Sequence, residues 1–394
     1  MEATPTEVSR RADPAAPDGA RRVVFVSSLL RFGGGERWML DTAERLRARG
    51  REVRLVARPG SAIGERARAR DLPLTTVQMR GDFDPLAVAG LARLFLSFRP
   101  HVVLPNLDRE IRLCALALRL SGLRRYGAVR LVPRRGSEFP LKNKRHYRFF
   151  YQRDVDSVIV NSLATKRTMV ESAPWFPREK AVVVYNGIDT EPYERLDAQR
   201  EMLRTSLRDR LGAARTAPVV TLVGELNARK GQQHVIQAAG AVLERHPQTR
   251  FLFVGEGDAR PTLERAIRER GLEGVVNLIG FRDDVPEIVA GSDVVILPSS
   301  VEGFGYALVE AMAVSVPVVA SNASSIPEIV EDNVTGYLHP VGDVPAIASA
   351  IGRLLASPDE ARAMGERGRQ TVRTRFGIER MVDEVEAVLF PGMG

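Results

Sequence analysis

Short segments made almost entirely of apolar residues recur along the first half of this chain, and helical periods separate most of them. These segments lie at residues 23–28, 53–57, 74–77, 101–104, 129–132 and 158–160. Strands with apolar side chains on both faces are buried on both faces, which is typical of parallel sheets covered by helices. The first half therefore predicts a parallel α/β domain.

The same rhythm restarts in the second half, after residue 189. Apolar segments lie at residues 219–223, 251–254, 275–279, 294–297 and 316–320, separated by helical stretches such as 232–244, 261–270 and 307–313. A chain of 394 residues exceeds what one hydrophobic core usually organises, so we predict two facing, doubly wound Rossmann-like α/β domains. A polar, helix-prone stretch at residues 191–210 would begin the second one. Ligands of this architecture bind outside the carboxyl ends of the strands, which predicts a working site in the interdomain cleft.

The composition is that of a folded globular protein, with 44% hydrophobic and 27% charged residues, and it excludes a mostly disordered chain. The single cysteine, Cys114, cannot form an intramolecular disulfide, and the five histidines are scattered. We therefore predict no metal and a reducing, cytoplasmic compartment. No apolar run approaches the ~20 residues that span a bilayer. Residues 1–20 lack the apolar segment of a signal peptide and predict a disordered tail.

Basic residues are concentrated in the first half. Residues 1–200 contain 37 Lys and Arg against 23 Asp and Glu, whereas residues 201–394 contain 20 against 26. A basic surface suits nucleic acid, an anionic membrane or an anionic substrate, or it is simply solvated. Charge alone does not choose among these.

Three consecutive glycines, Gly33, Gly34 and Gly35, follow the first predicted strand and precede a predicted helix at residues 36–49. Glycines let the backbone approach a ligand closely, and a helix amino terminus offers unpaired N–H groups to an anion. The spacing matches neither the G-x-G-x-x-G pattern nor a P-loop. The segment predicts either an anion-binding turn or merely a tight connection between strand and helix.

Two segments of the second half carry further candidates. Arg229 and Lys230 follow a predicted strand and precede a helix, a setting that suits a diphosphate unless both side chains are solvated. Glu302 lies in a glycine loop after another strand, and Glu310 follows it on a predicted helix. Two carboxylates so placed can accept hydrogen bonds from different hydroxyls of one ligand, while the loop backbone donates to its phosphate or sugar.

Together these motifs carry a resemblance to a known family. Glu302 and Glu310 form a Glu-x(7)-Glu motif, which occurs here with the glycine turn, Val184-Tyr185-Asn186-Gly187-Ile188-Asp189, Arg229-Lys230-Gly231, Gly255-Glu256-Gly257 and residues 275–281. From residue 23 to residue 388 the chain resembles the retaining, nucleotide-sugar-dependent glycosyltransferases of family four, which have the two-domain GT-B fold. The resemblance implies an acceptor-binding domain at residues 21–188 plus 374–394 and a donor-binding domain at residues 189–373.

The resemblance also implies roles for individual residues. Lys230 and Arg229 would hold the donor diphosphate, Glu302 would contact the donor sugar ring, and Glu310 would bind the ribose. Further donor contacts are implied for Gly34, Gly35, Phe281, Gly303, Phe304, Gly305 and Tyr306, with residues 279–282 cradling the base. The implied partners are a nucleoside-diphosphate sugar and a glycan or glycolipid acceptor of bacterial lipopolysaccharide or polysaccharide assembly, without a cofactor.

Two departures from the family pattern concern charge. Members often carry Gly-Arg-Leu where this chain has Gly224-Glu225-Leu226, so Arg229 is predicted to take over the diphosphate contact. Members often place a His near the acceptor where this chain has Arg134 and Arg135. Arginine cannot serve as a general base, so these two residues, with Asn106, are predicted to bind an anionic acceptor. The alternatives for the two arginines are the donor phosphate or a basic loop without a ligand.

Two other segments allow a second interpretation. Residues 141–153 interleave basic and aromatic side chains, which suits either an anionic membrane surface or core packing of the aromatic rings beneath solvated cations. The Asp82-Phe83-Asp84 run has no strand directly before it, so we interpret it as turn acids rather than a metal site.

Two rival classes of protein remain. A sugar-nucleotide epimerase or a phosphorylase on the same fold would keep the donor pocket, and an epimerase would convert the donor without an acceptor. A nucleic-acid-binding protein would use the basic half and show a steep salt dependence. The acidic second half and its glutamate-rich ligand loop argue against nucleic acid.

Overall fold

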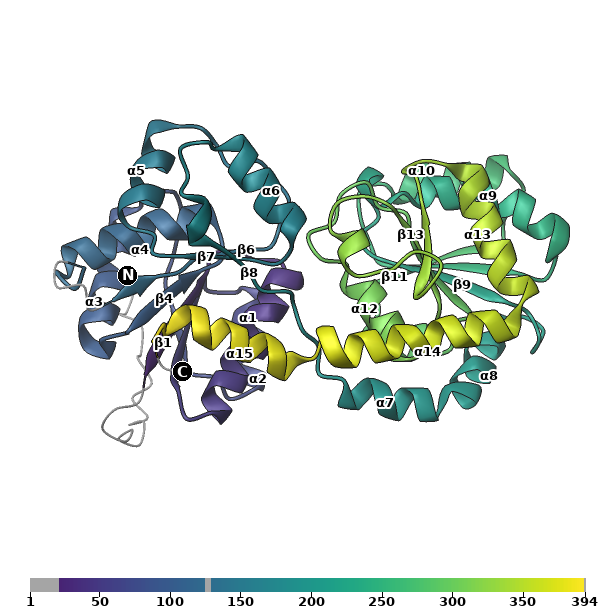
Figure 1. Ribbon diagram of the computed structural model, residues 1–394, viewed down its shortest axis with the longest axis horizontal. Coiled ribbons are helices and arrows are strands. Elements are labelled where there is room, and N and C mark those ends of the chain that lie inside the picture. Colours follow the sequence, from purple (N-terminus) through teal and green to yellow (C-terminus); the bar gives the residue numbers. More distant parts are fainter. Residues whose placement is uncertain (1–20, 125–128, 393–394) are drawn as a thin grey trace, which may run out of the picture.

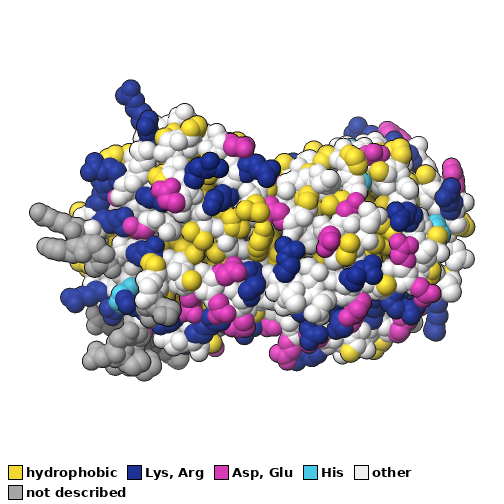
Figure 2. Space-filling view, in the orientation of Figure 1, with side chains coloured by type: hydrophobic (Ala, Val, Ile, Leu, Met, Phe, Trp, Pro, Cys, Tyr) yellow, Lys and Arg dark blue, Asp and Glu magenta, His cyan; other side chains and the backbone are white. Residues whose placement is uncertain are grey.

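The computed structural model describes residues 21–124 and 129–392 and forms two lobes side by side (Figure 1). In the space-filling view the lobes meet at a narrow waist (Figure 2). Each lobe has a parallel sheet with helices on both faces, so the predicted two-domain α/β fold is confirmed. The predicted tail at residues 1–20 lies outside the described residues.

The N-terminal lobe contains a sheet of strand order β3-β2-β1-β4-β5 and a second sheet of order β6-β7-β8. Its strands are β1 (Arg22–Ser27), β2 (Glu52–Ala57), β3 (Leu74–Thr76), β4 (Val102–Pro105), β5 (Arg130–Leu131), β6 (Arg134–Arg135), β7 (Val158–Val160) and β8 (Ala181–Val183). Its helices are α1 (Gly34–Ala48), α2 (Ala62–Ala69), α3 (Pro85–Phe98), α4 (Asp108–Leu120), α5 (Arg145–Arg153) and α6 (Leu163–Ser172), with a short 3₁₀ turn at Arg178–Lys180.

Strands β5 and β6 follow each other directly in the sequence, with a break at Pro133 between them. The sequence predicts a single strand at residues 129–132, but proline has no N–H for the ladder. On one side Val132 N donates to Val103 O at 2.9 Å, and on the other Ile159 N donates to Pro133 O at 2.9 Å. The two sheets of this lobe therefore meet at Pro133, and Arg134, directly after the break, is the first residue of β6.

The C-terminal lobe has one six-stranded parallel sheet of order β11-β10-β9-β12-β13-β14. Its strands are β9 (Val219–Val223), β10 (Arg250–Val254), β11 (Val276–Gly280), β12 (Val294–Leu297), β13 (Val318–Ser321) and β14 (Gly336–His339). Its helices are α7 (Glu191–Ala198), α8 (Arg200–Arg210), α9 (Gln232–Arg245), α10 (Arg260–Glu269), α11 (Val285–Ala290), α12 (Tyr306–Ala313), α13 (Val344–Ala356) and α14 (Pro358–Arg375), with 3₁₀ turns at Ala228–Lys230 and Ile326–Glu328.

The chain crosses between the lobes twice, and the two crossings lie side by side. Ile188, on the way out, forms a parallel bridge with Gly377, on the way back. The last helix, α15 (Ile378–Leu389), then packs on the N-terminal lobe (Figure 1), where Met381 and Val385 join the core of β1 and α1. Residues near both crossings are thus part of the hinge between the lobes.

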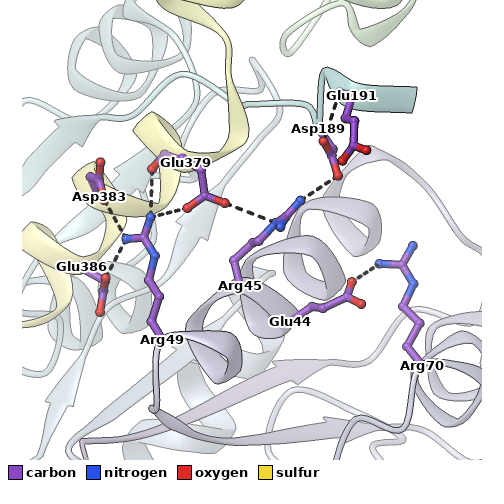
Figure 3. Close-up of polar contacts among 9 residues, drawn as sticks. All are labelled: Glu44, Arg45, Arg49, Arg70, Asp189, Glu191, Glu379, Asp383 and Glu386. Atoms are coloured by element: carbon purple, nitrogen blue, oxygen red, sulfur yellow. Dashed lines mark hydrogen bonds and ion pairs between the residues drawn. The ribbon is translucent and has the colours of Figure 1, made fainter. Parts of the chain in front are cut away.

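Two arginines at the end of α1, Arg45 and the C-cap residue Arg49, form ion pairs at the hinge (Figure 3). Arg45 pairs with Asp189 at 2.6 Å on the outgoing crossing and with Glu379 of α15 at 3.5 Å. One turn further on, Arg49 pairs with three α15 carboxylates, those of Glu379, Asp383 and Glu386. Partly exposed ion pairs of this kind contribute little individually, but a network that shares its arginines orients α15 on the lobe.

Candidate active site

A cavity of about 360 Å³ opens between the lobes at the carboxyl ends of both sheets. Most of the residues predicted from the sequence line it: Gly34, Gly35, Arg134, Lys230, Glu302, Gly303, Phe304, Gly305, Tyr306 and Glu310. The predicted residues outside its lining are Asn106, Arg135, Arg229 and Phe281. A larger hollow of about 500 Å³, between α8 and α13–α14, contains none of the predicted residues.

The glycine turn of the N-terminal lobe allows a close approach of the C-terminal lobe. A Cβ on Gly34 would lie 3.2 Å from the ring of Tyr306, and a Cβ on Gly35 would lie 3.0 Å from Nδ2 of Asn106. Gly33 is the N-cap of α1 and has no side chain to cap the helix, while the Glu36 carboxylate in the first turn accepts hydrogen bonds from the backbone of Gly33 and Glu36. The turn therefore presents the amino end of α1 to the cavity.

Lys230 enters the cavity from the loop after β9. Gly231 caps α9 with φ of 73°, and a Cβ there would collide with Pro298 O, so the tight turn that places Lys230 requires glycine. The Lys230 Nζ pairs with the Glu302 carboxylate, which also accepts a hydrogen bond from Ser299 Oγ at 2.9 Å. A cation and a carboxylate thus share the site where the second-domain loops meet.

Glu302 and Gly303 lie in the loop that joins β12 to α12. Gly305 ends this loop as the N-cap of α12 with φ of 96°, a conformation that favours glycine. Glu302 N donates to Ser324 Oγ at 3.0 Å, and that hydroxyl also contacts the Glu138 carboxylate of the N-terminal lobe. The amino end of α12 therefore faces the cavity opposite the amino end of α1.

The lobes touch around this loop. A Cβ on Gly303 would lie 2.0 Å from Gly136 O, so the two backbones are in direct contact. Nearby, the Glu328 carboxylate accepts hydrogen bonds from Leu163 N at 2.7 Å and Ala164 N at 2.8 Å, which caps α6 from the other lobe. The described arrangement is thus one in which the lobes are closed against each other.

Glu310, the second glutamate of the motif, is bound by one residue from each lobe. It accepts hydrogen bonds from Arg37 of α1 and from Tyr193 Oη at 2.9 Å. Burial lowers the pKa of Arg37, but the Glu310 charge outweighs it and the pKa is raised above its usual value. The Arg37 guanidinium also lies 4.9 Å from the centre of the Tyr306 ring. Arg37 and Tyr193 are site residues that the sequence analysis missed, because only the fold brings them to Glu310.

Arg134 forms part of the cavity wall in the N-terminal lobe. Its side chain is buried, with the residue 4% exposed, and its guanidinium lies 4.8 Å from the centre of the Trp38 ring. It donates one hydrogen bond to Asn186 Oδ1 at 3.3 Å. Burial lowers the pKa of Arg134 from its ordinary value.

Glu36, which the sequence analysis did not consider as a site residue, lies behind the glycine turn. Its carboxylate accepts hydrogen bonds from Ser27 Oγ at 3.2 Å and Asn106 Nδ2 at 2.8 Å. Burial raises the pKa of Glu36 above its ordinary value. Asn106 therefore orients Glu36 and Gly35 from behind the cavity wall, while Arg135 turns away from the cavity to bond the carbonyl of Phe139.

Two residues predicted to contact the donor lie outside the lining of this cavity. Arg229 is exposed, and its guanidinium lies 5.6 Å from the centre of the Phe139 ring rather than in the cavity. The adjacent Lys230 points inward because Gly231 reverses the chain there. Phe281 is 67% exposed just beyond β11 and does not line the cavity.

The Asp82-Phe83-Asp84 run has a structural role. Asp84 is the N-cap of α3 and accepts hydrogen bonds from Leu86 N and Ala87 N, while Asp82 pairs with Arg109 and Arg112.

Within residues 21–124 and 129–392, no group of three or more His, Cys, Asp or Glu side chains could hold a metal ion. Nor is any described helix long and apolar enough to cross a membrane.

Comparison with known proteins identifies what this arrangement is similar to. Residues 204–371 match the family model of glycosyl transferases group 1, and residues 32–192 match that of glycosyltransferase family 4. N-acetyl-alpha-D-glucosaminyl L-malate synthase of Bacillus anthracis is 32% identical over 214 residues, 54% of each chain, so the match spans about half of that relative. The lipopolysaccharide core biosynthesis glycosyltransferase LpsE of Rhizobium meliloti is 26% identical over 357 residues, covering 89% of this chain and 94% of that one.

Solved structures agree in fold over nearly the whole chain. Anabaena HepE in complex with UDP-glucose has a TM-score of 0.79 at 25% identity, covering 93% of this chain and 99% of that one. A glycosyltransferase from Rickettsia africae has a TM-score of 0.83 at 18% identity, covering 95% of this chain and all of that one, 100%. With two parallel-sheet lobes, a cavity between them and a glycosyltransferase family model matched in each half, the chain has the GT-B fold and is a transferase enzyme similar to glycosyltransferase family 4.

Proposed function

We propose that this enzyme is a retaining glycosyltransferase that transfers a sugar from a nucleoside-diphosphate sugar to a glycan or glycolipid acceptor of bacterial polysaccharide or lipopolysaccharide assembly. The observation that carries the proposal is the interlobe cavity, where the amino ends of α1 and α12 face each other beside Lys230 and Glu302. Two helix amino termini and a lysine suit a diphosphate, and a carboxylate beside them suits sugar hydroxyls. The names of LpsE and of the UDP-glucose complex of HepE support the same substrate classes.

Some residues of the cavity act on the departing diphosphate, and others bind the donor sugar. Lys230 and the backbone N–H groups after Gly305 stabilise the negative charge that develops on the departing diphosphate. Glu302 accepts hydrogen bonds from the donor sugar and holds Lys230 in place. Both carboxylates that line the cavity are already engaged, Glu302 by Lys230 and Ser299 and Glu310 by Arg37 and Tyr193. We therefore propose front-face attack, in which the acceptor oxygen bonds to the sugar carbon while its proton passes to the departing phosphate oxygen.

Nucleotide binding tests the proposal directly. With a panel of nucleoside diphosphates and their sugars, we expect one base to raise the unfolding temperature, since a ligand at 100 times its Kd adds about 2.7 kcal/mol to the stability. Incubation of the selected sugar nucleotide with candidate acceptors, followed by NMR of the product, is then expected to show the anomeric configuration of the donor. Inversion would contradict the retaining mechanism, and an epimer formed from donor alone would favour the epimerase.

We further propose that the basic N-terminal lobe contacts an anionic membrane surface at the cytoplasmic side, through α5. Lys142, Lys144, Arg145, Arg148 and Arg153 are exposed around this helix, and Lys and Arg side chains lie over this lobe in Figure 2. Three aromatic residues of the segment, Tyr147, Phe150 and Tyr151, are buried in the core, whereas Phe149 is 39% exposed beside Arg153. The surface proposed here is therefore mainly electrostatic, with the exposed Phe83 ring 6.1 Å from that of His146 at its border.

Charge reversal on α5 is expected to release the enzyme from anionic vesicles. Each cation near such a surface contributes about 1 kcal/mol, so the double variant Arg145→Glu/Arg148→Glu should weaken binding by at least about 2 kcal/mol. The matched control is Arg265→Glu/Arg268→Glu, which reverses two exposed cations of α10 on the other lobe. Co-sedimentation with anionic and neutral vesicles at low and high salt measures the effect. Equal recovery with both kinds of vesicle would remove the membrane from the proposal.

A further inference from the structure

The charges around the cavity are paired except at one arginine. Lys230 pairs with Glu302, and Glu310 pairs with Arg37. Arg134 is 4% exposed and more deeply buried than Lys230 or Arg37, yet no carboxylate of the described residues lies within 4.0 Å of its guanidinium. A buried cation without a counter-charge is costly, and a bound anion relieves that cost.

The carboxylate that acts on Arg134 through space is already occupied. Glu36 influences the arginine electrostatically but directs its carboxylate at Ser27 and Asn106. The hydrogen bond that Arg134 does make, to the amide oxygen of Asn186, is long at 3.3 Å. The guanidinium therefore keeps donor capacity for a ligand.

The Arg134 guanidinium lies where the two glycine-rich loops meet. Its Nη1 is 3.4 Å from where a Cβ on Gly35 would lie, and it fills the space beside Gly136, which contacts Gly303. The Tyr306 hydroxyl is also buried and has no hydrogen-bond partner among the described residues. Hydrogen-bond donors from both lobes thus converge on one side of the cavity.

Resting on the proposed function, we propose that Arg134 binds the β-phosphate of the sugar donor from the N-terminal lobe and stabilises the departing nucleoside diphosphate. When the bond between the sugar carbon and the β-phosphate oxygen breaks, that oxygen keeps the electron pair and the charge on the phosphate rises. A guanidinium offers two parallel N–H groups to such a phosphate, and its effect grows as the charge develops. Arg134 then takes the place that the sequence suggested for Arg229.

A phosphate is favoured over a carboxylate on the sugar or the acceptor because of the charge in the other lobe. Among the described lining residues, Lys230 is the sole cation that the C-terminal lobe supplies, and Glu302 partly neutralises it. Glu225 and Arg229 are exposed outside the cavity. A diphosphate held by that lobe alone would keep most of its negative charge, and Arg134, which lines the cavity from the N-terminal lobe, can offset it.

The test compares nucleoside diphosphate with nucleoside monophosphate. The probes are UDP and UMP, or the guanosine or adenosine pair if the panel selects another base, measured by calorimetry on the full chain. In the wild type the diphosphate is expected to bind more tightly than the monophosphate. In Arg134→Met this ratio of affinities should fall by at least about tenfold, the usual value of one charge-assisted hydrogen bond, while monophosphate binding is kept.

Matched variants separate the role from a general effect on folding. Arg130→Met removes another partly buried arginine of the same line of chain, which bonds the carbonyls of Val388 and Leu389, and should leave the ratio unchanged. If Arg134→Met does not fold, Arg134→Lys is used instead. Lysine keeps the positive charge but does not offer two parallel N–H groups, so the ratio of diphosphate to monophosphate affinity should fall by a smaller factor.

Each remaining outcome overturns the inference. An unchanged ratio in the Arg134 variants shows that the arginine does not meet the β-phosphate. An equal loss for UDP and UMP assigns it a structural role, and a loss confined to UDP-glucuronate relative to UDP-glucose assigns it to a sugar carboxylate. If no nucleotide binds the wild type, the proposed function itself fails.

Discussion

Replacing Lys230 by methionine is expected to lower kcat/KM for the donor by about 10²–10³-fold, the cost of losing one preorganised electrostatic contact to a developing charge. The structure places Lys230 Nζ in the cavity against Glu302. Removing the lysine therefore deletes the proposed diphosphate contact and also leaves the Glu302 carboxylate where negative charge is expected to accumulate. Steady-state kinetics with the donor varied, and circular dichroism to confirm the fold, measure the effect.

The neighbouring Arg229→Met is the matched control for this prediction. Arg229 is exposed and directs its guanidinium at Phe139, outside the cavity. Its loss should change kcat/KM by less than a few-fold, since surface substitutions rarely cost more than about 0.5 kcal/mol. The opposite result, a damaged Arg229→Met beside an active Lys230→Met, would restore the sequence-based assignment and contradict the placement of both side chains.

Strands could be predicted from the sequence where both of their faces are buried. The strand interiors at 23–28 and 219–223 are apolar on both faces, and the structure confirms both as central parallel strands, β1 and β9. Prediction failed where strands are short. β6 has two residues, Arg134 and Arg135, and no apolar run marks it. Its pairing depends on Pro133 and on β7, which lies 23 residues or more along the chain and leaves no local signal.

The candidate site could be predicted where a loop carries a recognisable pattern of residues. A glycine with positive φ next to a charged residue, as at Lys230 and Gly231, is visible in the sequence because the turn requires it. The sequence does not reveal which of two adjacent cations points inward, as with Arg229 and Lys230, since that depends on the turn geometry. The Arg37 to Glu310 contact joins residues 273 positions apart and is created only by the closure of the lobes.

Gly303→Ala is the second substitution expected to have a large effect, because it acts on that closure. A Cβ at position 303 would lie 2.0 Å from Gly136 O, closer than any side-chain carbon approaches backbone, so the lobes or the loop must move apart. A displacement of about 1 Å at a reacting centre can cost about 10²-fold in rate. We therefore expect kcat to fall on that order, with the unfolding free energy lowered by about 1–3 kcal/mol.

The control for this change is a glycine with room for a methyl group. Gly240 is exposed within α9 and has no heavy atom within 4 Å of a Cβ, so Gly240→Ala should raise stability by about 0.5–1 kcal/mol and leave kcat unchanged. The Glu328 contact with the amino end of α6 would still hold the lobes near each other in Gly303→Ala. The nucleotide should therefore still bind while transfer slows. If Gly303→Ala transfers sugar at the wild-type rate, the backbone contact between Gly136 and Gly303 is absent from the working enzyme, and catalysis proceeds with the lobes further apart.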